Sequence, residues 1–391
     1  MTLKWFQTRA SPIAVDLGTD NIKLLQIDAR GGQPHIMVAN RVDVPDHVHN
    51  DSPERDTWLV ENLRRAVVEG GFRGRAVVTS FPATRMVLRH VRVPRVSEAE
   101  VPRVVMQELQ GKLPFDVTTA VIRHVVVSDI YQGQDAKLEV IAMVTSRESV
   151  ERHLGIFDRA KLELAGIHVE QAALVEAFSY MFASGSGQQA NMFIDIGASS
   201  THVVMAHGRK MVFTRYIPIG GEIMNRRVSQ AMKWPPDKTR LMRMRMEQQI
   251  FRQRRKAASQ AGATLAEYDP EGWESEDYVP MDVALEATIQ ESLLEPTEQL
   301  AKELEACVRY YESIFPDRPL ERVIFVGGES RYLSTCARLA KPMAIPAVLG
   351  DPLSRLLRDD RTRANINLKH PQPGWAVTVG LALGVEGVTG V

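Results

Sequence analysis

The chain of 391 residues has an ordinary globular composition, with 44% hydrophobic and 25% charged residues, and its length suggests two or three domains. Basic and acidic residues both number 48, so the formal net charge is zero and no overall basic field favours nucleic acid or anionic lipid. Cys307 and Cys336 are the only cysteines, which argues against a disulfide framework or a structural zinc site and favours a reducing compartment.

The sequence has no obvious membrane-targeting segment. Residues 1–12 include Lys4 and Arg9 but lack the apolar run of a signal peptide. Apolar-leaning stretches such as residues 172–183 are too short to span a bilayer, and this one contains Glu176. We therefore expect any contact with a membrane to be made through a partner.

Residues 13–27 contain an apolar run, then Asp-x-Gly-Thr, then an alternating apolar run, which predicts two strands joined by a tight turn. Gly18 lets backbone N–H groups approach an anion, and Asp16, at the end of the first strand, is placed to hold a hydrated Mg²⁺. Thr19 and Lys23 add a hydroxyl and a charge that can reach phosphate. The alternative is an ordinary hairpin with turn-forming residues at 18–21.

The following segments predict the rest of an α/β half-domain. We expect a strand at 36–44, a helix at 58–69 that ends at Gly70-Gly71, and a strand at 76–80.

Residues 84–148 predict a small inserted subdomain. Ser97 and Glu100 form a capping box for a helix that runs to about residue 112. Strands are expected at 87–93, 120–128 and 137–145.

Residues 149–164 predict a helix, 168–174 a strand and 175–183 the helix that joins the two halves, before a polar linker at 184–189. Glu176, at the expected start of the joining helix, is positioned to orient a water molecule towards a terminal phosphate. The alternative is an acidic first-turn residue favoured by the helix dipole.

Residues 191–205 repeat the opening pattern about 180 residues later, with Asp-x-Gly and hydroxyl residues between two apolar strands. Two such turns facing each other across a cleft can hold a phosphate chain, with Asp16 and Asp195 bracketing a hydrated Mg²⁺. His202 is interpreted as a strand residue rather than a catalytic one. A strand at 211–218, a turn at 219–221 and a helix at 222–232 follow.

Residues 240–256 are basic and rich in methionine, whereas residues 267–277 are acidic. We interpret them as a solvated helix followed by a loop. The alternative is a docking surface, because methionine side chains suit adaptable contacts. The two runs of opposite charge can also pair with each other, which disfavours a nucleic-acid site.

In the remaining sequence, Gly327-Gly328 lies between a strand at 322–326 and a helix at 332–340, where a purine or ribose can approach the backbone. A long helix interrupted near Pro296, a later strand and a closing helix are expected at 283–315, 345–349 and 376–385.

These motifs together resemble the actin-like ATPase superfamily of actin, Hsp70-type chaperones and sugar kinases. The two phosphate motifs lie at 16–19 and 195–199 and the adenosine motif at 326–330, while 175–178 and 374–385 resemble the connecting segments. The resemblance implies an α/β, two-lobed, ribonuclease H-like fold that binds ATP in a central cleft. No Gly-x-x-x-x-Gly-Lys-Ser/Thr motif occurs, so the chain is not a P-loop enzyme.

Within the superfamily, the sequence resembles the PilM family of type IV pilus assembly and PilM-like competence proteins. The resemblance is carried by the first hairpin with Lys23-Leu24-Leu25, the Leu-Pro-Phe-Asp turn at 113–116, and the Thr-Arg-Tyr-Ile-Pro-Ile-Gly-Gly run at 214–221.

This resemblance implies an FtsA-like small subdomain with a groove for the short cytoplasmic tail of the inner-membrane protein PilN, and little or slow ATP hydrolysis. It also implies contacts with other pilus assembly components. The protein is then cytoplasmic and peripheral at the inner membrane through its partners, with a homo-oligomer or filament left open.

The expected division is a first lobe at 1–83 and 149–187, the inserted subdomain at 84–148, a second lobe at 188–225 and 321–391, and a second-lobe insertion at 226–320 with a charged extension at about 240–280. Glu329 stands where a third glycine is usual in the family. The residues expected to bind Mg-ATP are Asp16, Gly18, Thr19, Asp20, Asn21, Lys23, Asp195, Gly197, Ala198, Ser199, Ser200, Gly220, Gly221, Gly327, Gly328, Glu329 and Ser330.

Other functions on this fold are weighed as alternatives. An actin-fold small-molecule kinase generally uses an aspartate base near the connecting segment, but residues 167–183 contain only Glu170 and Glu176 as acids. An Hsp70-like chaperone is disfavoured because the sequence stops after the second connecting helix. An FtsA-like filament former needs an amphipathic C-terminal anchor, for which residues 385–391 are too short and too rich in glycine.

Overall fold

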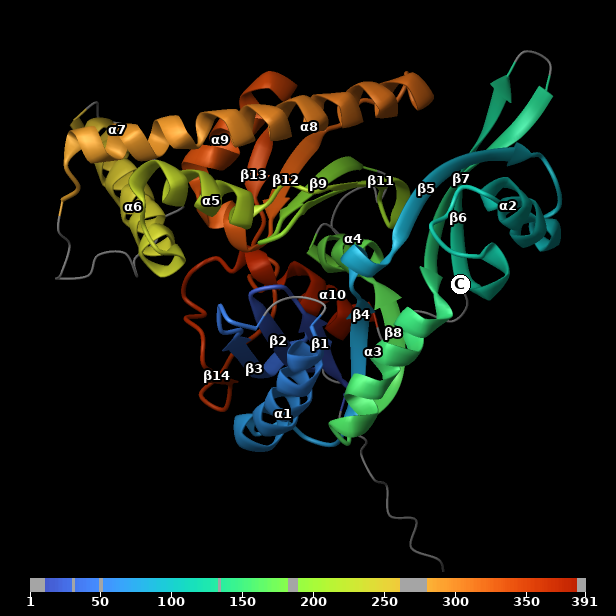
Figure 1. The fold of residues 1–391 in the computed structure, drawn as a ribbon, viewed down its shortest axis with the longest axis horizontal. Coiled ribbons are helices and arrows are strands. Elements are labelled where there is room, and N and C mark those ends of the chain that lie inside the picture. The colour runs from blue at the N-terminus through green and yellow to red at the C-terminus, as the bar shows by residue number, and fades with distance from the viewer. Residues whose placement is uncertain are drawn as a thin grey trace, which may run out of the picture.

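The structure, a computed structural model, describes residues 11–29, 32–48, 52–132, 135–181, 189–260 and 280–384. Three β-sheets with their covering helices organise these residues (Figure 1). The acidic segment 267–277, the tail 385–391 and most of the linker 184–189 lie outside the described residues.

The first sheet has the strand order β14-β3-β2-β1-β4-β8. Alternating side chains of β1 explain why both of its faces are covered: Ile13 and Val15 pack against α1 and α3, whereas Ala14 belongs to the core shared with α4. The predicted helix end at Gly70-Gly71 is confirmed, since Gly71 has a φ of 81°. The elements of this lobe are β1 (Ile13–Leu17), β2 (Asn21–Asp28), β3 (His35–Asp43), α1 (Pro53–Gly70), β4 (Ala76–Phe81), α3 (Arg147–Arg159), β8 (Glu163–Val169), α4 (Glu170–Met181), β14 (Arg363–Ala364) and α10 (Ala376–Gly384).

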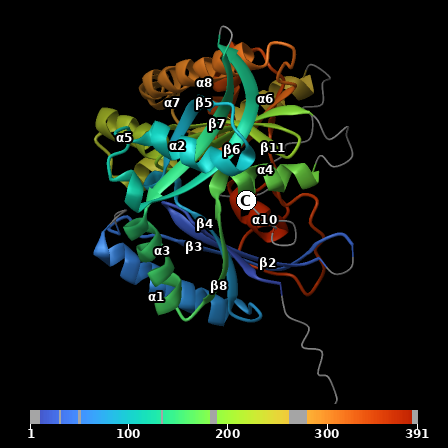
Figure 2. The same ribbon diagram turned by 90° about the vertical axis from the view of Figure 1, so that its right-hand side faces the viewer.

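The second sheet has the order β11-β10-β9-β12-β13, and helices α7 and α8 lie along its outer side in both views (Figures 1 and 2). The predicted long helix at 283–315 is two helices that meet at Leu293; Pro296 lies in the first turn of the second helix, where a missing N–H costs no helical bond. The elements are β9 (Ala190–Ile196), β10 (Thr201–His207), β11 (Lys210–Ile217), α5 (Gly221–Met232), α6 (Pro236–Gln260), α7 (Val283–Ser292), α8 (Leu294–Ile314), β12 (Arg322–Val326), α9 (Leu333–Met343) and β13 (Ala347–Leu349).

The third sheet, in the order β5-β7-β6, lies within the predicted insertion and faces the viewer in Figure 2. Its inner face packs against α2 through residues such as Val93, Val105 and Val140. The expected capping contact is present, because Glu100 accepts hydrogen bonds from N and Oγ of Ser97 at 3.2 and 2.7 Å. The elements are β5 (Val87–Pro94), α2 (Val101–Leu109), β6 (Ala120–Gln132) and β7 (Asp135–Ser146).

A buried carboxylate joins the inserted subdomain to the second lobe. Glu139 of β7 is 1% exposed and accepts hydrogen bonds from Arg92 Nε at 3.0 Å and from the hydroxyl of Tyr310, in α8, at 2.7 Å. Nδ1 of His90 lies 3.5 Å from the same carboxylate, and its Nε2 lies 3.0 Å from the carbonyl oxygen of Thr214 in β11. Separating the two parts would leave buried polar groups without partners, so these contacts fix the subdomain against the second lobe.

After β13 the chain returns to the first lobe. The backbone N–H of Ile36 donates to the carbonyl of Leu357 at 2.8 Å, and β14 then pairs with β3. Helix α10 packs against α4 and against β1, β2 and β4. The range 321–391, which we assigned to the second lobe, therefore supplies a strand and a helix to the first.

The connecting helix begins earlier than predicted. Strand β8 ends at Val169 and α4 begins at Glu170, so residues 170–174 are helical rather than part of a strand. An apolar run of this length fits either structure, and its Gln-Ala-Ala-Leu sequence is strongly helix-forming. Consequently Glu170, and not Glu176, occupies the first turn.

Candidate functional site

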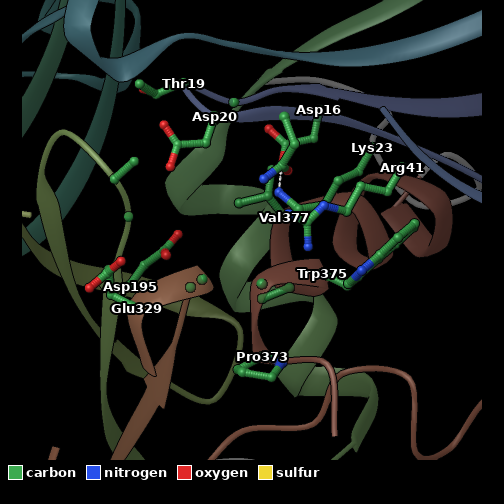
Figure 3. Close-up of a pocket in the computed structure, with 18 of the residues that line it drawn as sticks. Asp16, Thr19, Asp20, Lys23, Arg41, Asp195, Glu329, Pro373, Trp375 and Val377 are labelled. Atoms are coloured by element: carbon green, nitrogen blue, oxygen red, sulfur yellow. Dashed lines mark hydrogen bonds and ion pairs between the residues drawn. The ribbon is translucent and has the colours of Figure 1, made fainter. Parts of the chain in front are cut away.

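A cavity of about 840 Å³ lies between the lobes, within the range of small-molecule sites (Figure 3). Its walls are the β1–β2 and β9–β10 turns, the segment η5 (Gly328–Arg331) after β12, part of α6, and residues 365–377, which include η6 (Pro373–Trp375). The two turns that the sequence repeat predicted therefore meet at one site.

The first turn is held by its own strands and by α1. Asp16 and Lys23 are direct partners in the β1–β2 ladder, and their side chains form an ion pair of 3.1 Å. Arg55, which is buried, donates to the carbonyl oxygens of Gly18 at 2.6 Å and Thr19 at 3.0 Å. These contacts fix the shape of the turn beside the cavity.

The second turn is supported by the start of α5. Gly220 and Gly221, predicted as phosphate-binding residues, lie behind the turn rather than on the cavity wall. The N–H of Gly221 donates to the carbonyl of Gly197 at 3.0 Å, and the next N–H donates to the carbonyl of Ala198 at 2.7 Å. The two glycines thus shape the turn and do not face the ligand space.

The predicted adenosine motif passes very close to the second turn. Gly327 has a φ of 90°, and a Cβ there would lie 2.3 Å from Oδ1 of Asp195, so another residue would not fit. Ser330 is buried behind the motif and donates to the carbonyl of Val326.

The other predicted residues line the cavity. In Figure 3 the side chains of Asp16, Asp20 and Lys23 lie above those of Asp195 and Glu329. The full set is Asp16, Gly18, Thr19, Asp20, Asn21, Lys23, Asp195, Gly197, Ala198, Ser199, Ser200, Gly327, Gly328 and Glu329.

Buried and half-buried acids dominate the electrostatics at the centre of the site. Burial raises the pKa of Asp195 to about 6 and also raises the pKa of Asp16, although the charge of Lys23 opposes the shift. Burial alone would lower the pKa of His202, but its hydrogen bond to Glu170 and the charges of Glu170 and the two aspartates raise it. A cation placed here would stabilise the ionised aspartates.

The donor set fits a hydrated metal ion better than a directly bound one. Among the described residues, no group of three or more His, Cys, Asp or Glu side chains has the arrangement of a metal site. Mg²⁺ keeps much of its water shell and takes few carboxylates. Asp16 and Asp195 line the cavity and can accept hydrogen bonds from the waters of such an ion.

Glu170 lines the cavity and Glu176 does not, because α4 starts five residues before the predicted position. Glu170 lies 3.2 Å from Nδ1 of His202, whose Nε2 lies 3.1 Å from the hydroxyl of Ser200. Glu176 pairs instead with Arg209. Glu170 and not Glu176 is therefore the acid of α4 that lies at the cavity, and His202, which is a strand residue of β10 as interpreted from the sequence, also lines it.

Other cavity residues were not anticipated from the sequence. Arg240 and Met244 of α6 lie in its wall, and Arg240 also pairs with Asp46 of the first lobe. The basic, methionine-rich composition of 240–256 was the available signal. That segment is helical as predicted but not wholly solvated, since Arg243 is fully buried.

Comparison with known proteins relates this geometry to a family. A family model described as type IV pilus assembly protein PilM matches residues 14–254. A solved structure of a "PilM-PilN type IV pilus biogenesis complex" is 17% identical, with 96% of this chain and 99% of that chain covered and a TM-score of 0.71. The ethanolamine utilization protein EutJ from Carboxydothermus hydrogenoformans is 14% identical, with 96% and 90% covered and a TM-score of 0.52. No match was found among curated proteins.

Because the two solved structures are only 17% and 14% identical to this chain, the similarity concerns the fold alone. It confirms the two-lobed actin-like fold predicted from the repeated turns. The family-model match covers more than half of the chain and includes the first turn, the inserted subdomain and the second turn. This protein therefore belongs to the PilM family of type IV pilus assembly proteins.

Proposed function

We propose that this protein is an ATP-binding assembly component of a type IV pilus or a related secretion machine. The observation that carries the proposal is the meeting of two Asp-x-Gly turns at one cavity, each with an aspartate whose pKa is raised by burial. The cavity volume of about 840 Å³ suits a nucleotide, and the hydroxyls of Thr19 and Ser199 with the ammonium of Lys23 suit a phosphate chain.

In this proposal Asp16 and Asp195 hold a magnesium ion through its waters. When bound, the ion neutralises phosphate charge. The protein's own part is to fix the two turns, to exclude water with the buried strands behind them, and to present hydroxyl and backbone donors to the phosphate oxygens. ATP then acts as a ligand that joins the two lobes.

The proposed partner is the short cytoplasmic tail of a PilN-like inner-membrane protein, which binds the inserted subdomain. This proposal is supported by family membership and by the similar solved structure, a PilM-PilN complex. Among the described residues, no helix is both long and apolar enough to cross a bilayer. In this proposal the partner holds the protein at the cytoplasmic face of the inner membrane.

We propose the four-part division predicted from the sequence, with residues 363–384 moved from the second lobe to the first.

The experiment is a peptide pull-down with a substitution on the inserted subdomain. Met106 of α2 is a 41% exposed apolar side chain of that subdomain, and Leu154 of α3, equally exposed at 41%, lies on the first lobe. We expect Met106→Asp to weaken capture by an immobilised PilN-like N-terminal peptide, and Leu154→Asp to leave it unchanged. Absence of capture by the wild-type protein, with a scrambled peptide as background, would contradict the proposed partner.

A small-molecule kinase is the second candidate, because Glu170 and His202 lie in the cavity beside the phosphate turns. A carboxylate there can accept a proton from water, giving slow ATP hydrolysis, or from a substrate hydroxyl, giving phosphoryl transfer. Incubation with ATP and a panel of small alcohols and acids separates the two. Phosphorylated product that disappears in Glu170→Gln would favour the kinase, and phosphate release alone would favour the assembly protein.

A further inference from the structure

Arg243 of α6 is 0% exposed although it carries a charge. Its guanidinium donates to Oδ1 of Asn225 at 2.5 Å and to Oε2 of Glu329 at 2.8 Å, and it lies 4.2 Å from the ring centroid of Tyr332. Arginine does not lose its proton in proteins, so a buried guanidinium needs a paired carboxylate. Arg243 therefore fixes Glu329 in one position.

The second oxygen of Glu329 is directed elsewhere. Oε1 lies against Gly221, where an added Cβ would be 2.3 Å from it, so the glycine leaves room for this carboxylate. The side chain is 15% exposed and lines the cavity. Among the described residues, the donor that contacts this carboxylate is Arg243, through Oε2. The carboxylate is thus held in one orientation by Arg243, and its exposed part lines the cavity.

The surroundings of Glu329 differ from those of the phosphate turns. Met244 and Tyr332 give this wall apolar and aromatic surface alongside Arg240 and Arg331, which pair with Asp46 and Gln372. The hydroxyl groups and Lys23 belong to the two turns. A phosphate chain between the turns leaves the wall of α6 and η5 for the nucleoside. A carboxylate paired with a guanidinium offers only acceptors, so it favours an N–H or O–H group and disfavours a ligand acceptor.

We infer that Glu329, held by Arg243, accepts a hydrogen bond from the nucleoside part of the ligand and selects nucleotides that carry a donor there. The donor is a ribose hydroxyl or an amino group of the base, two sources of the same chemistry. The inference rests on the proposed nucleotide-binding function and assigns a specificity-determining role to Glu329 and a positioning role to Arg243. The alternative is that the ion pair only ties α6 to η5.

The test measures the dissociation constants of the full chain for three nucleotides with Mg²⁺, by calorimetry. ATP is compared with 2′,3′-dideoxy-ATP, which lacks both ribose hydroxyls, and with purine riboside triphosphate, which lacks the 6-amino group. A hydrogen bond to a charged acceptor predicts that at least one analogue binds about tenfold or more weakly than ATP, and the weaker analogue identifies the donor.

The discriminating variant is Glu329→Gln. Arg243 then donates its hydrogen bond to the amide oxygen, so the amide NH₂ faces the nucleoside and offers a donor in place of an acceptor. We expect ATP affinity to fall about tenfold and its advantage over the analogue to disappear. The matched control is Glu247→Gln on the same helix, whose carboxylate accepts from N of Ser334 at 2.7 Å and does not line the cavity. The control should keep the full preference.

Where Glu329→Gln fails to fold, Arg243→Met with Glu329→Gly removes the pair without leaving a buried charge, and it should also lose the preference. A preference that survives in either folded variant overturns the inference, as does equal binding of the three nucleotides by the wild-type protein. Failure of the wild-type protein to bind any nucleotide is a different result, which overturns the proposed function and this inference with it.

Discussion

The hydroxyl oxygens of Thr19 and Ser199 lie 3.1 Å apart, although 180 positions separate the two residues in sequence. The turns of the two lobes therefore touch at the cavity, and a phosphate chain that binds between them has to replace this contact. On the proposed site, the distance between the turns is therefore expected to differ between the empty and the nucleotide-bound protein.

This contact predicts that the lobes can be locked by oxidation. Thr19→Cys with Ser199→Cys should form a disulfide readily, while Cys307 and Cys336 are buried and do not compete. We expect the oxidised double variant to lose nucleotide binding and to regain it in reductant, as measured with a fluorescent ATP analogue. The two single variants serve as controls. Unchanged affinity after complete oxidation would place the phosphate chain elsewhere.

Substitution of the two central aspartates separates binding from folding. Asp16→Asn with Asp195→Asn should lower Mg-ATP affinity at least tenfold on the proposed site, since both carboxylates face the cavity. The midpoint temperature of thermal unfolding should not fall. Burial raises the pKa of both groups, so their ionised forms destabilise the folded protein at neutral pH. Asp158→Asn, on the exposed side of α3, is the control. Full affinity in the double variant would exclude the cavity as the magnesium site.

The carboxylate between the inserted subdomain and α8 is expected to contribute strongly to stability. Glu139→Ala should lower the free energy of unfolding by about 2–3 kcal/mol, because it leaves buried partners unpaired. Tyr310→Phe, which removes one hydroxyl, should cost about 1 kcal/mol. Urea denaturation gives both values, and hydrogen exchange should rise in β5 and β7. Equal, negligible losses would mean that the subdomain is held by apolar contacts alone.

The packing of α10 on α4 predicts a contrast between two glycines of one helix. A Cβ on Gly380 would lie 1.7 Å from the carbonyl oxygen of Ala173, whereas a Cβ on Gly384 meets nothing closer than 3.5 Å. Gly380→Ala should therefore destabilise the protein by about 3 kcal/mol or prevent folding, and Gly384→Ala should be nearly neutral. Thermal unfolding of the two variants decides the point, and similar midpoints would contradict the close contact of these helices.

A buried histidine predicts sensitivity to acid. His153 packs between Phe81 and Phe157, and burial lowers its pKa to about 4. In the unfolded chain His153 is protonated below pH about 6.5, whereas in the folded chain it stays neutral until about pH 4. The free energy of unfolding therefore falls across that interval by on the order of 2–3 kcal/mol. His153→Phe should flatten the curve of unfolding free energy between pH 6.5 and 4. A slope unchanged by the substitution would assign acid sensitivity to other groups.

The two turns could be predicted because each is a local pattern and the pattern occurs twice. Glu170 could not, since the run that follows it fits a strand or a helix equally well, and placing the helix start five residues too late moved the predicted acid to Glu176. The pairing of Arg243 with Glu329 spans 86 positions and depends on how α6 packs, which no local pattern contains. Residues 365–373 carry neither periodicity nor motif, so their place in the cavity wall could not be predicted from the sequence.

The return of the chain to the first lobe after β13 has a consequence for synthesis. Strand β14 and helix α10 complete the first lobe, but they are encoded after every strand of the second sheet. On the ribosome the second sheet, which is contiguous between Ala190 and Leu349 apart from its helices, has all its strands before the first lobe has its last helix. The first part of the gene therefore specifies the lobe that finishes folding last, and that lobe depends on the second having emerged.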